Sequence, residues 1–205
     1  MNKFIAFILI IIVAPILGGV YGLIHDQLTY TVSTEYYTKF KFIQFGLENW
    51  GLGQNIGTEK LPEIKLLNPR FGAGIVGILA TWWVGLFIGV ILGFVGLIHK
   101  NGKEMFKSTM KAFILTTGIA LLTGTIGLGY GKLFLTENLP NWYLPGNLIN
   151  IDNFIMVGSM HNFSYLGGFI GLIFGVIYTI KKKNEYKRHT TKPIHNAGFS
   201  DKLKV

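Results

Sequence analysis

Four long apolar blocks, separated by polar stretches, constrain this chain more than any other feature of its sequence. They cover residues 4–24, 72–98, 112–131 and 155–180 and contain no Asp, Glu, Lys or Arg. A helix that crosses a bilayer needs about 20 mostly apolar residues, because the hydrocarbon core is about 30 Å thick. Each block reaches that length. We therefore predict an all-α fold, a four-helix transmembrane bundle formed by residues 1–181.

The composition agrees with burial in lipid. Half of the residues are hydrophobic and 14% are charged, whereas a soluble domain carries about 25% charged residues. The first block is longer than the apolar region of a signal peptide and lacks a small-x-small cleavage site, so we interpret it as a retained helix.

The placement of lysine and arginine predicts the orientation. Almost all of the formal charge of +9 lies in Lys3, in the connection 99–111 and in the tail after residue 180. Positive charge collects on the cytoplasmic side of membrane proteins. We expect a multi-pass membrane protein with both termini in the cytoplasm and with the loop 25–70 outside, where it forms a small extracytoplasmic cap.

The basic tail, residues 182–205, is polar and has no hydrophobic periodicity, so we expect it to be disordered. Lys181, Lys182 and Lys183 directly follow the last apolar block. Lysines in this position meet anionic lipid headgroups. We interpret them as a membrane anchor and not as a nucleic-acid site.

Several classes of site are excluded. The chain has no cysteine, which rules out disulfides, thiolate metal sites and cysteine nucleophiles. It also has no phosphate-binding loop, dinucleotide fingerprint, HExxH or GxSxG motif. The sequence therefore names no catalytic residue.

Glycines recur at four-residue spacing on three of the predicted helices. In lipid, small residues at this spacing let helix backbones approach closely. We expect these stripes to pack the bundle internally, or else to bind partner membrane subunits or a second copy of the chain. The glycines are Gly85, Gly89 and Gly93, then Gly127 and Gly131, then Gly167, Gly171 and Gly175.

Trp82 and Trp83 lie about ten residues into the second block, although membrane tryptophans are usually found at the interfaces. One interpretation is that they fill space between helices. The other is that they form an aromatic wall for an apolar ligand.

The outer loop begins with elements that could be ordered. Ser33 and Thr34 can cap a short helix with Glu35 in its first turn. The following segment 39–45 alternates partly and is rich in phenylalanine, which suits an interfacial strand or a segment on the headgroups.

Polar side chains gather at the predicted outer end of the bundle. In the fourth block, His161, Ser164 and Tyr165 share one helical face by their i, i+3, i+4 spacing. Buried polar groups in hydrocarbon need partners. The ligand or metal candidates are His25, Asp26, Glu35 and His161, with Arg70, Trp82, Trp83, Ser164 and Tyr165 as supporting residues.

Three interpretations of this group stay open. It could be a structural hydrogen-bond network that holds the outer loop on the bundle. It could be a site for a divalent metal or a substrate, because imidazole and carboxylate together suit Zn²⁺. It could also be a b-type haem site with His25 and His161 as axial ligands.

Three sequence segments carry a resemblance to known proteins. They are His25-Asp26-Gln27 with Glu35-Tyr36-Tyr37, then residues 80–86 (ATWWVGL), then His161 with Ser164-Tyr165-Leu166. The chain resembles a family of uncharacterised bacterial four-span inner-membrane proteins with the pattern HDQ…EYF, ATWWxGL and HxxSYL. It departs from the pattern at Tyr37, where phenylalanine is usual, and at residues 39–41, where glycine-histidine-proline is common. The resemblance implies a bacterial inner membrane and no particular reaction.

Two functional hypotheses follow. The first is a membrane protein with a polar, metal- or ligand-binding site at the outer leaflet, acting on a lipid-like or periplasmic ligand. The second is a non-catalytic scaffold or accessory subunit of a membrane complex. A transporter is less well supported, since a single histidine is the only ionic group within the spans.

Overall fold

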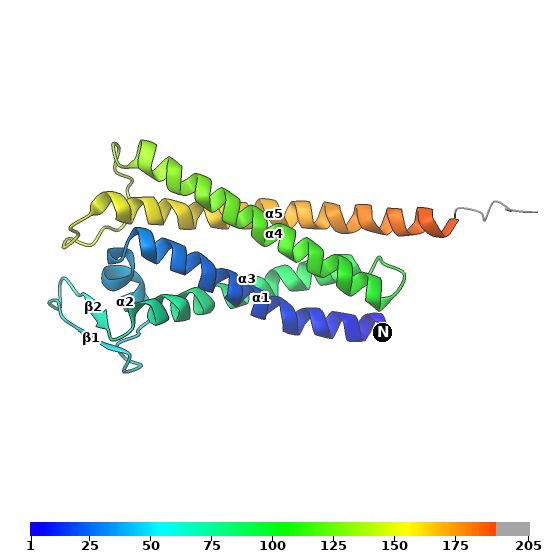
Figure 1. Ribbon diagram of the computed structural model, residues 1–205, viewed down its shortest axis with the longest axis horizontal. Helices are drawn as coiled ribbons and strands as arrows, with labels where there is room; N and C mark the ends of the chain where they lie inside the picture. The colour runs from blue at the N-terminus through cyan, green and yellow to red at the C-terminus, as the bar shows by residue number, and fades with distance from the viewer. Residues whose placement is uncertain (192–205) are drawn as a thin grey trace, which may run out of the picture.

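The computed structural model describes the backbone of residues 1–191 and the side chains through residue 185. Within that range, four helices are long and apolar enough to cross a membrane. The all-α four-helix bundle predicted from the apolar blocks is therefore confirmed. The four helices run roughly along one long axis (Figure 1).

Helices α1 (Lys3–Val32) and α3 (Pro69–Gly96) form the first pair. Helix α1 continues eight residues beyond the predicted apolar block and so includes His25 and Asp26. This extension contains neither glycine nor proline, and its threonine hydroxyls donate to backbone carbonyls one turn earlier. Hydropathy marks where a helix is apolar, not where it ends.

Helices α4 (Gly102–Tyr130) and α5 (Ile151–Thr191) form the second pair. A π-helical turn, η2 (Gly131–Leu135), extends α4. The connection between the second and third spans is shorter than predicted, since α4 begins at Gly102, directly after its N-cap residue Asn101. The expected disorder of 182–205 is wrong for its first ten residues, which continue α5 without a glycine or proline; residues 192–205 lie outside the described residues.

Close backbone contacts hold each pair together. A Cβ on Gly22 would lie 2.1 Å from the carbonyl oxygen of Gly77, so α1 and α3 meet only because both residues are glycine. On α5, a Cβ on Gly171 would lie 2.7 Å from the carbonyl oxygen of Thr116 on α4. The glycine stripes expected from the sequence are thus used for packing within the chain.

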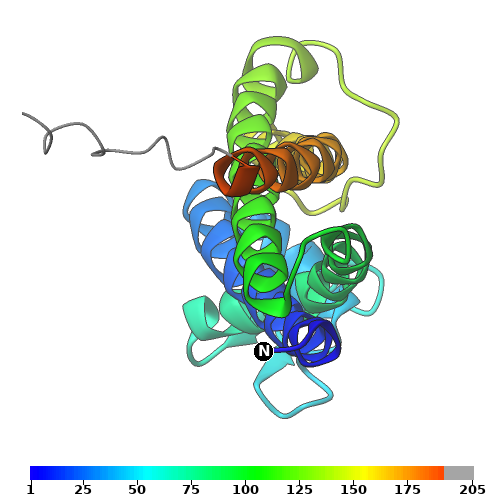
Figure 2. The same ribbon diagram turned by 90° about the vertical axis from the view of Figure 1, so that its right-hand side faces the viewer.

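The two pairs contact each other less extensively than the two helices within each pair do. Both α1 with α3 and α4 with α5 make extensive contacts, whereas the contacts between pairs are sparser. The end-on view shows α4 and α5 on one side, with α1 and α3 on the other (Figure 2). A cavity lies between the two pairs.

The loop between α1 and α3, residues 33–68, forms a compact cap at the end of the bundle opposite the N-terminus, which we call the hairpin end (Figure 1). It contains a π-helical turn η1 (Tyr37–Lys41), a short helix α2 (Phe42–Gln44) and an antiparallel pair of strands, β1 (Gly53–Asn55) and β2 (Ile64–Leu66). The segment 39–45 is therefore helical, and the strand considered for it is wrong. Its aromatic side chains pack into a buried cluster over the ends of the helices.

Candidate metal centre and cavity

Helix α1 presents His25 and Asp26 to the interior near the hairpin end, with exposed fractions of 4% and 3%. The close approach of α1 to α3 sets this orientation. The Thr81 hydroxyl of α3 donates to the carbonyl of Gly18 at 2.8 Å, about two helical turns before the site. The glycine contact therefore fixes which face of α1 turns inward.

Helix α5 supplies His161 and Ser164, each 8% exposed. Gly124 of α4 leaves the room that Ser164 occupies, because a Cβ there would lie 2.1 Å from the serine oxygen. His161 is ten residues from the start of α5, about 15 Å along the axis at 1.5 Å per residue. Helix α5 begins at Ile151, four residues before the apolar block predicted from the sequence.

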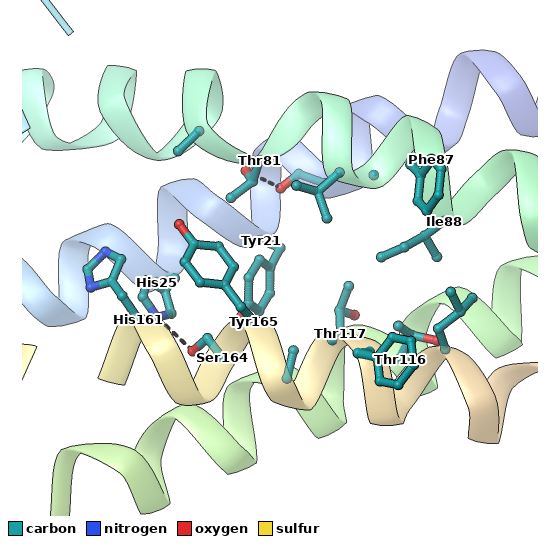
Figure 3. A pocket seen from close by; sticks show the side chains of 18 of the residues that line it. Tyr21, His25, Thr81, Phe87, Ile88, Thr116, Thr117, His161, Ser164 and Tyr165 are labelled. Carbon is teal, nitrogen blue, oxygen red and sulfur yellow. Dashed lines mark hydrogen bonds between the residues drawn. The ribbon is translucent and has the colours of Figure 1, made fainter. Parts of the chain in front are cut away.

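One carboxylate oxygen joins the two helices. Oδ1 of Asp26 lies 3.1 Å from Nδ1 of His25 and 3.5 Å from Nε2 of His161. The other ring nitrogen of His25, Nε2, lies 3.0 Å from the Ser164 hydroxyl (Figure 3). Segments more than 130 residues apart in sequence thus meet at a single oxygen atom.

The tautomer of His161 follows from its second ring nitrogen. Nδ1 lies 2.9 Å from the carbonyl oxygen of Val157, which can only accept a hydrogen bond, so Nδ1 carries the proton. In a neutral ring, Nε2 then has a lone pair, and this lone pair faces the carboxylate of Asp26. Two electron-rich atoms in a buried site repel one another unless a proton or a metal ion lies between them.

The remaining oxygen of Asp26 supports the same conclusion. Oδ2 is buried and has no hydrogen-bond partner among the described residues. Buried carboxylate oxygens are normally satisfied, and an orphan points to a water or an ion at the site. One ligand atom from each of His25, Asp26 and His161 can be chosen so that all three lie within 4.8 Å of one another.

A haem between the two histidines does not fit. The imidazole rings contact each other edge to face, with centroids 4.8 Å apart, so no macrocycle can lie between them. The ring of Tyr36 stacks on the other side of His161 at 4.9 Å. Among the interpretations drawn from the sequence, the haem site is not supported.

The structure does not bring Glu35 to this group. Its carboxylate accepts from Lys39 and from the backbone N–H groups of Ile149 and Asn150, at 3.0 and 2.7 Å. Burial alone would raise the pKa of Glu35, but these hydrogen bonds outweigh it and the pKa is lowered. Glu35 ties the cap to the start of α5. As expected from the sequence, the Ser33 oxygen caps this segment by accepting from the N–H of Tyr36.

Arg70 and the tryptophans also lie elsewhere. Arg70 donates to the Thr31 hydroxyl and so links the start of α3 to the end of α1. Trp82 and Trp83 are 45% and 56% exposed on the outside of the bundle and do not line the cavity beside His25 and His161. Trp82 borders a separate surface groove with Pro15 and other α1 side chains.

A cavity of about 230 Å³ extends from the polar group between the two helix pairs. His25, His161 and Ser164 lie at one end, whereas Phe87, Ile88 and Thr116 lie toward the other (Figure 3). Its walls are predominantly apolar. The cavity therefore has a polar end beside His25, His161 and Ser164, which we call the head chamber. We call the apolar remainder, toward Phe87, Ile88 and Thr116, the slot.

Two wall residues were not identified from the sequence. Tyr21 lies one turn before His25 on the same face of α1, a spacing that could have placed it in the site. Lys41 reaches the cavity from the cap, and no spacing rule predicts that, since η1 folds back over the bundle. Burial lowers the pKa of Lys41, and the charge of Asp26 acts in the opposite direction.

Comparison with protein families, with curated proteins and with solved structures finds no match. The chemistry of this site is therefore argued from its own geometry.

Proposed function

We propose that this multi-pass membrane protein binds a divalent ion of the Zn²⁺ class through His25, Asp26 and His161, and acts on the polar end of a molecule dissolved in the membrane. The single observation behind the proposal is the position of His161, whose Nδ1 is bound to the Val157 carbonyl and whose Nε2 lies 3.5 Å from a buried carboxylate oxygen. A cation between Nε2 and this carboxylate oxygen would form a coordinate bond with each of them.

The spacing of the ligand atoms supports a metal of this size. Tetrahedral Zn²⁺ with bonds of 2.0–2.1 Å holds neighbouring ligand atoms about 3.3 Å apart. The two imidazole nitrogens lie 3.1 and 3.5 Å from the shared Asp26 oxygen. The two histidine nitrogens lie within 4.8 Å of each other and would approach one another to receive the ion.

The surrounding hydrogen bonds also suit metal ligands. Ligating histidines usually donate their other ring N–H to an oxygen, which fixes the tautomer and the ring orientation. The Val157 carbonyl does this for His161, and the Ser164 hydroxyl is placed to do it for His25.

Three protein ligands leave one coordination position, as in catalytic rather than structural zinc sites. A metal held this way supplies an activated water or polarises a carbonyl or phosphoryl oxygen. The three proposed ligands all line the cavity. We infer that a molecule bound in the cavity would occupy the fourth coordination position of the metal.

The proposal includes the orientation expected from the lysine distribution, with the hairpin end outside a bacterial inner membrane and the site in the outer leaflet. A scaffold that binds partners through its glycine stripes is a weaker alternative, because those glycines already pack helices within the chain.

Metal analysis of the purified protein tests the proposal. We expect one equivalent of zinc per chain after purification in chelator-free buffer and dialysis against micromolar zinc. His161→Gln and Asp26→Asn should lose it. Glu35→Gln, at the acidic residue outside the cluster, and Asp152→Asn, the matched aspartate change on α5, should keep it.

A proton shared between His161 and Asp26 is the competing explanation, and the same experiment separates the two. If wild-type protein binds no stoichiometric divalent metal, or if Asp26→Asn binds as much as Asp152→Asn, the metal site is wrong and the group is a hydrogen-bond network.

A further inference from the structure

From the shape and charge of the cavity, and building on the proposed metal site, we propose that the protein binds a single-chain anionic amphiphile. Its headgroup would lie between Lys41 and the His25–Asp26–His161 cluster, and its chain would occupy the apolar slot between the helix pairs. The shared ligand chemistry is one alkyl or isoprenyl chain ending in a carboxylate or a phosphate.

Lys41 supplies the argument for an anionic headgroup. It is 8% exposed, and no carboxylate of the described residues lies within ion-pair distance of its ammonium group. Its Nζ donates to Gln44 at 3.1 Å and lies 5.3–5.9 Å from the ring centroids of Tyr36, Phe40 and Phe45. A buried cation held by aromatic rings beside a cavity is a binding site for an anion, because burying an unpaired charge is otherwise costly.

Tyr21 adds a second unsatisfied group at the same end. Its hydroxyl is buried without a hydrogen-bond partner among the described residues, and the ring lines the cavity. A phenol donor, an ammonium group and a metal position therefore converge on the head chamber. Together they can bind the oxygens of one carboxylate or phosphate.

The slot beyond the head chamber fits one chain. An apolar cavity of 150 Å³ accommodates benzene, and this cavity measures about 230 Å³. That volume holds a segment of one hydrocarbon chain and cannot enclose two chains side by side.

The slot opens on the outer surface of the apolar helices. Phe87 of α3 and Phe169 of α5 line the cavity, yet they are 62% and 66% exposed. Tyr165, also on α5, is 56% exposed. An amphiphile could thus enter sideways from the bilayer between α3 and α5, with the rest of a long chain remaining among the lipids.

Gly168 of α5 offers a way to block the slot without touching the polar group. It lines the cavity, and a Cβ added there would meet nothing within 4 Å. Gly118 of α4 has the same open surroundings but does not line the cavity. Gly168→Leu and Gly118→Leu are therefore a matched pair.

The experiment measures binding of laurate, dodecyl phosphate and dodecanol to the full chain in phosphatidylcholine nanodiscs, by native mass spectrometry of the released protein. We expect one anionic amphiphile per chain, bound at least about tenfold more tightly than dodecanol, as one hydrogen bond to a charged group would give. Whichever anion binds better identifies the headgroup as a carboxylate or a phosphate.

Two variants distinguish binding of the headgroup from binding of the hydrocarbon chain. Lys41→Met should remove the preference for the anions, whereas Lys65→Met, at an exposed lysine of β2, should keep it. Gly168→Leu should abolish binding of all three compounds, and Gly118→Leu should leave it unchanged. Equal binding of dodecanol and the anions, or equal behaviour of the two leucine variants, would overturn the proposal.

Metal-depleted protein distinguishes a failure of this proposal from a failure of the metal site. Binding that persists after chelation and still depends on Lys41 and Gly168 would support the amphiphile site alone. Zinc content retained by Gly168→Leu shows that its polar group has folded; if the wild type binds no zinc, an unchanged unfolding temperature serves instead.

Discussion

At the scale of single residues, the main finding is that a backbone carbonyl determines the chemistry of His161. The carbonyl of Val157, one turn earlier on α5, fixes the proton on Nδ1 and directs a lone pair at Asp26. Ser164 has the corresponding position beside His25. These partners lie outside the proposed metal position, yet they orient the two histidines that we propose as its ligands.

Removing the Ser164 hydroxyl should weaken metal binding without abolishing it. We predict that Ser164→Ala lowers zinc affinity about 10–100-fold, the usual cost of losing a hydrogen bond to a ligating histidine. Competition against a chromophoric chelator measures this. Asn162→Ala, two residues away on the exposed face, is the control; equal affinities of the two variants would contradict the role assigned to Ser164.

Glu35 should instead affect stability, and in a pH-dependent way. Its pKa in the folded protein lies below the ordinary value of 4.5. The carboxylate therefore contributes stability that is fully present above pH 4.5 and is lost as the pH falls through the lower folded value.

We predict that Glu35→Gln reduces the free energy of unfolding by about 1.5–3 kcal/mol at pH 7, as expected for hydrogen bonds to a charged group. The difference should shrink below pH 4.5. Thermal unfolding in detergent at pH 7 and at a pH below 4.5 measures this difference. Glu59→Gln, at an exposed glutamate of the same loop, is the control. A difference that stays constant with pH would contradict a stabilising contribution from the charge of Glu35.

The sequence allowed partial prediction of the residues at the site. His25, Asp26 and His161 could be selected because polar groups near the end of an apolar helix need partners. Glu35 could not be separated from them, since its alternative partners, Lys39 and the start of α5, depend on the path of a 46-residue loop. Lys41 was missed for the same reason.

At the scale of secondary-structure elements, glycine placement decides how closely the helices approach. The spacing of glycines was readable from the sequence, but the partner of each stripe was not, because any two stripes can pair in lipid. The helix ends were also missed, since capping by Asn101 and the polar last turns of α1 do not register in hydropathy.

We predict opposite effects for two glycine-to-alanine changes. Gly22→Ala forces a Cβ against Gly77 and Thr81 and should destabilise the protein by about 1–3 kcal/mol, the typical cost of overpacking. Gly118→Ala meets nothing and should stabilise it by up to about 1 kcal/mol through helix propensity. Unfolding temperatures of both proteins provide the measurement; a neutral Gly22→Ala would mean that α1 and α3 are farther apart.

At the scale of the whole molecule, the protein consists of two closely packed helix pairs joined by sparser contacts, with the polar group bridging α1 and α5. A metal at this bridge would bind both pairs at once. It should therefore stabilise the bundle, because it binds the folded state and not the separated pairs.

Zinc at 100 times its Kd should raise the free energy of unfolding by about 2.7 kcal/mol. We expect this increase as a higher unfolding temperature for the wild type, with no change for His161→Gln. An equal increase in both proteins would assign the effect to zinc bound elsewhere.

X-ray absorption at the zinc edge tests the metal centre most directly. We predict a first shell of nitrogen and oxygen at 2.0–2.1 Å, with the outer-shell scattering of two imidazole rings, reduced to one ring or lost in His161→Gln. A shell of oxygen atoms without imidazole scattering, or the same spectrum in wild type and His161→Gln, would contradict a zinc site at His25, Asp26 and His161.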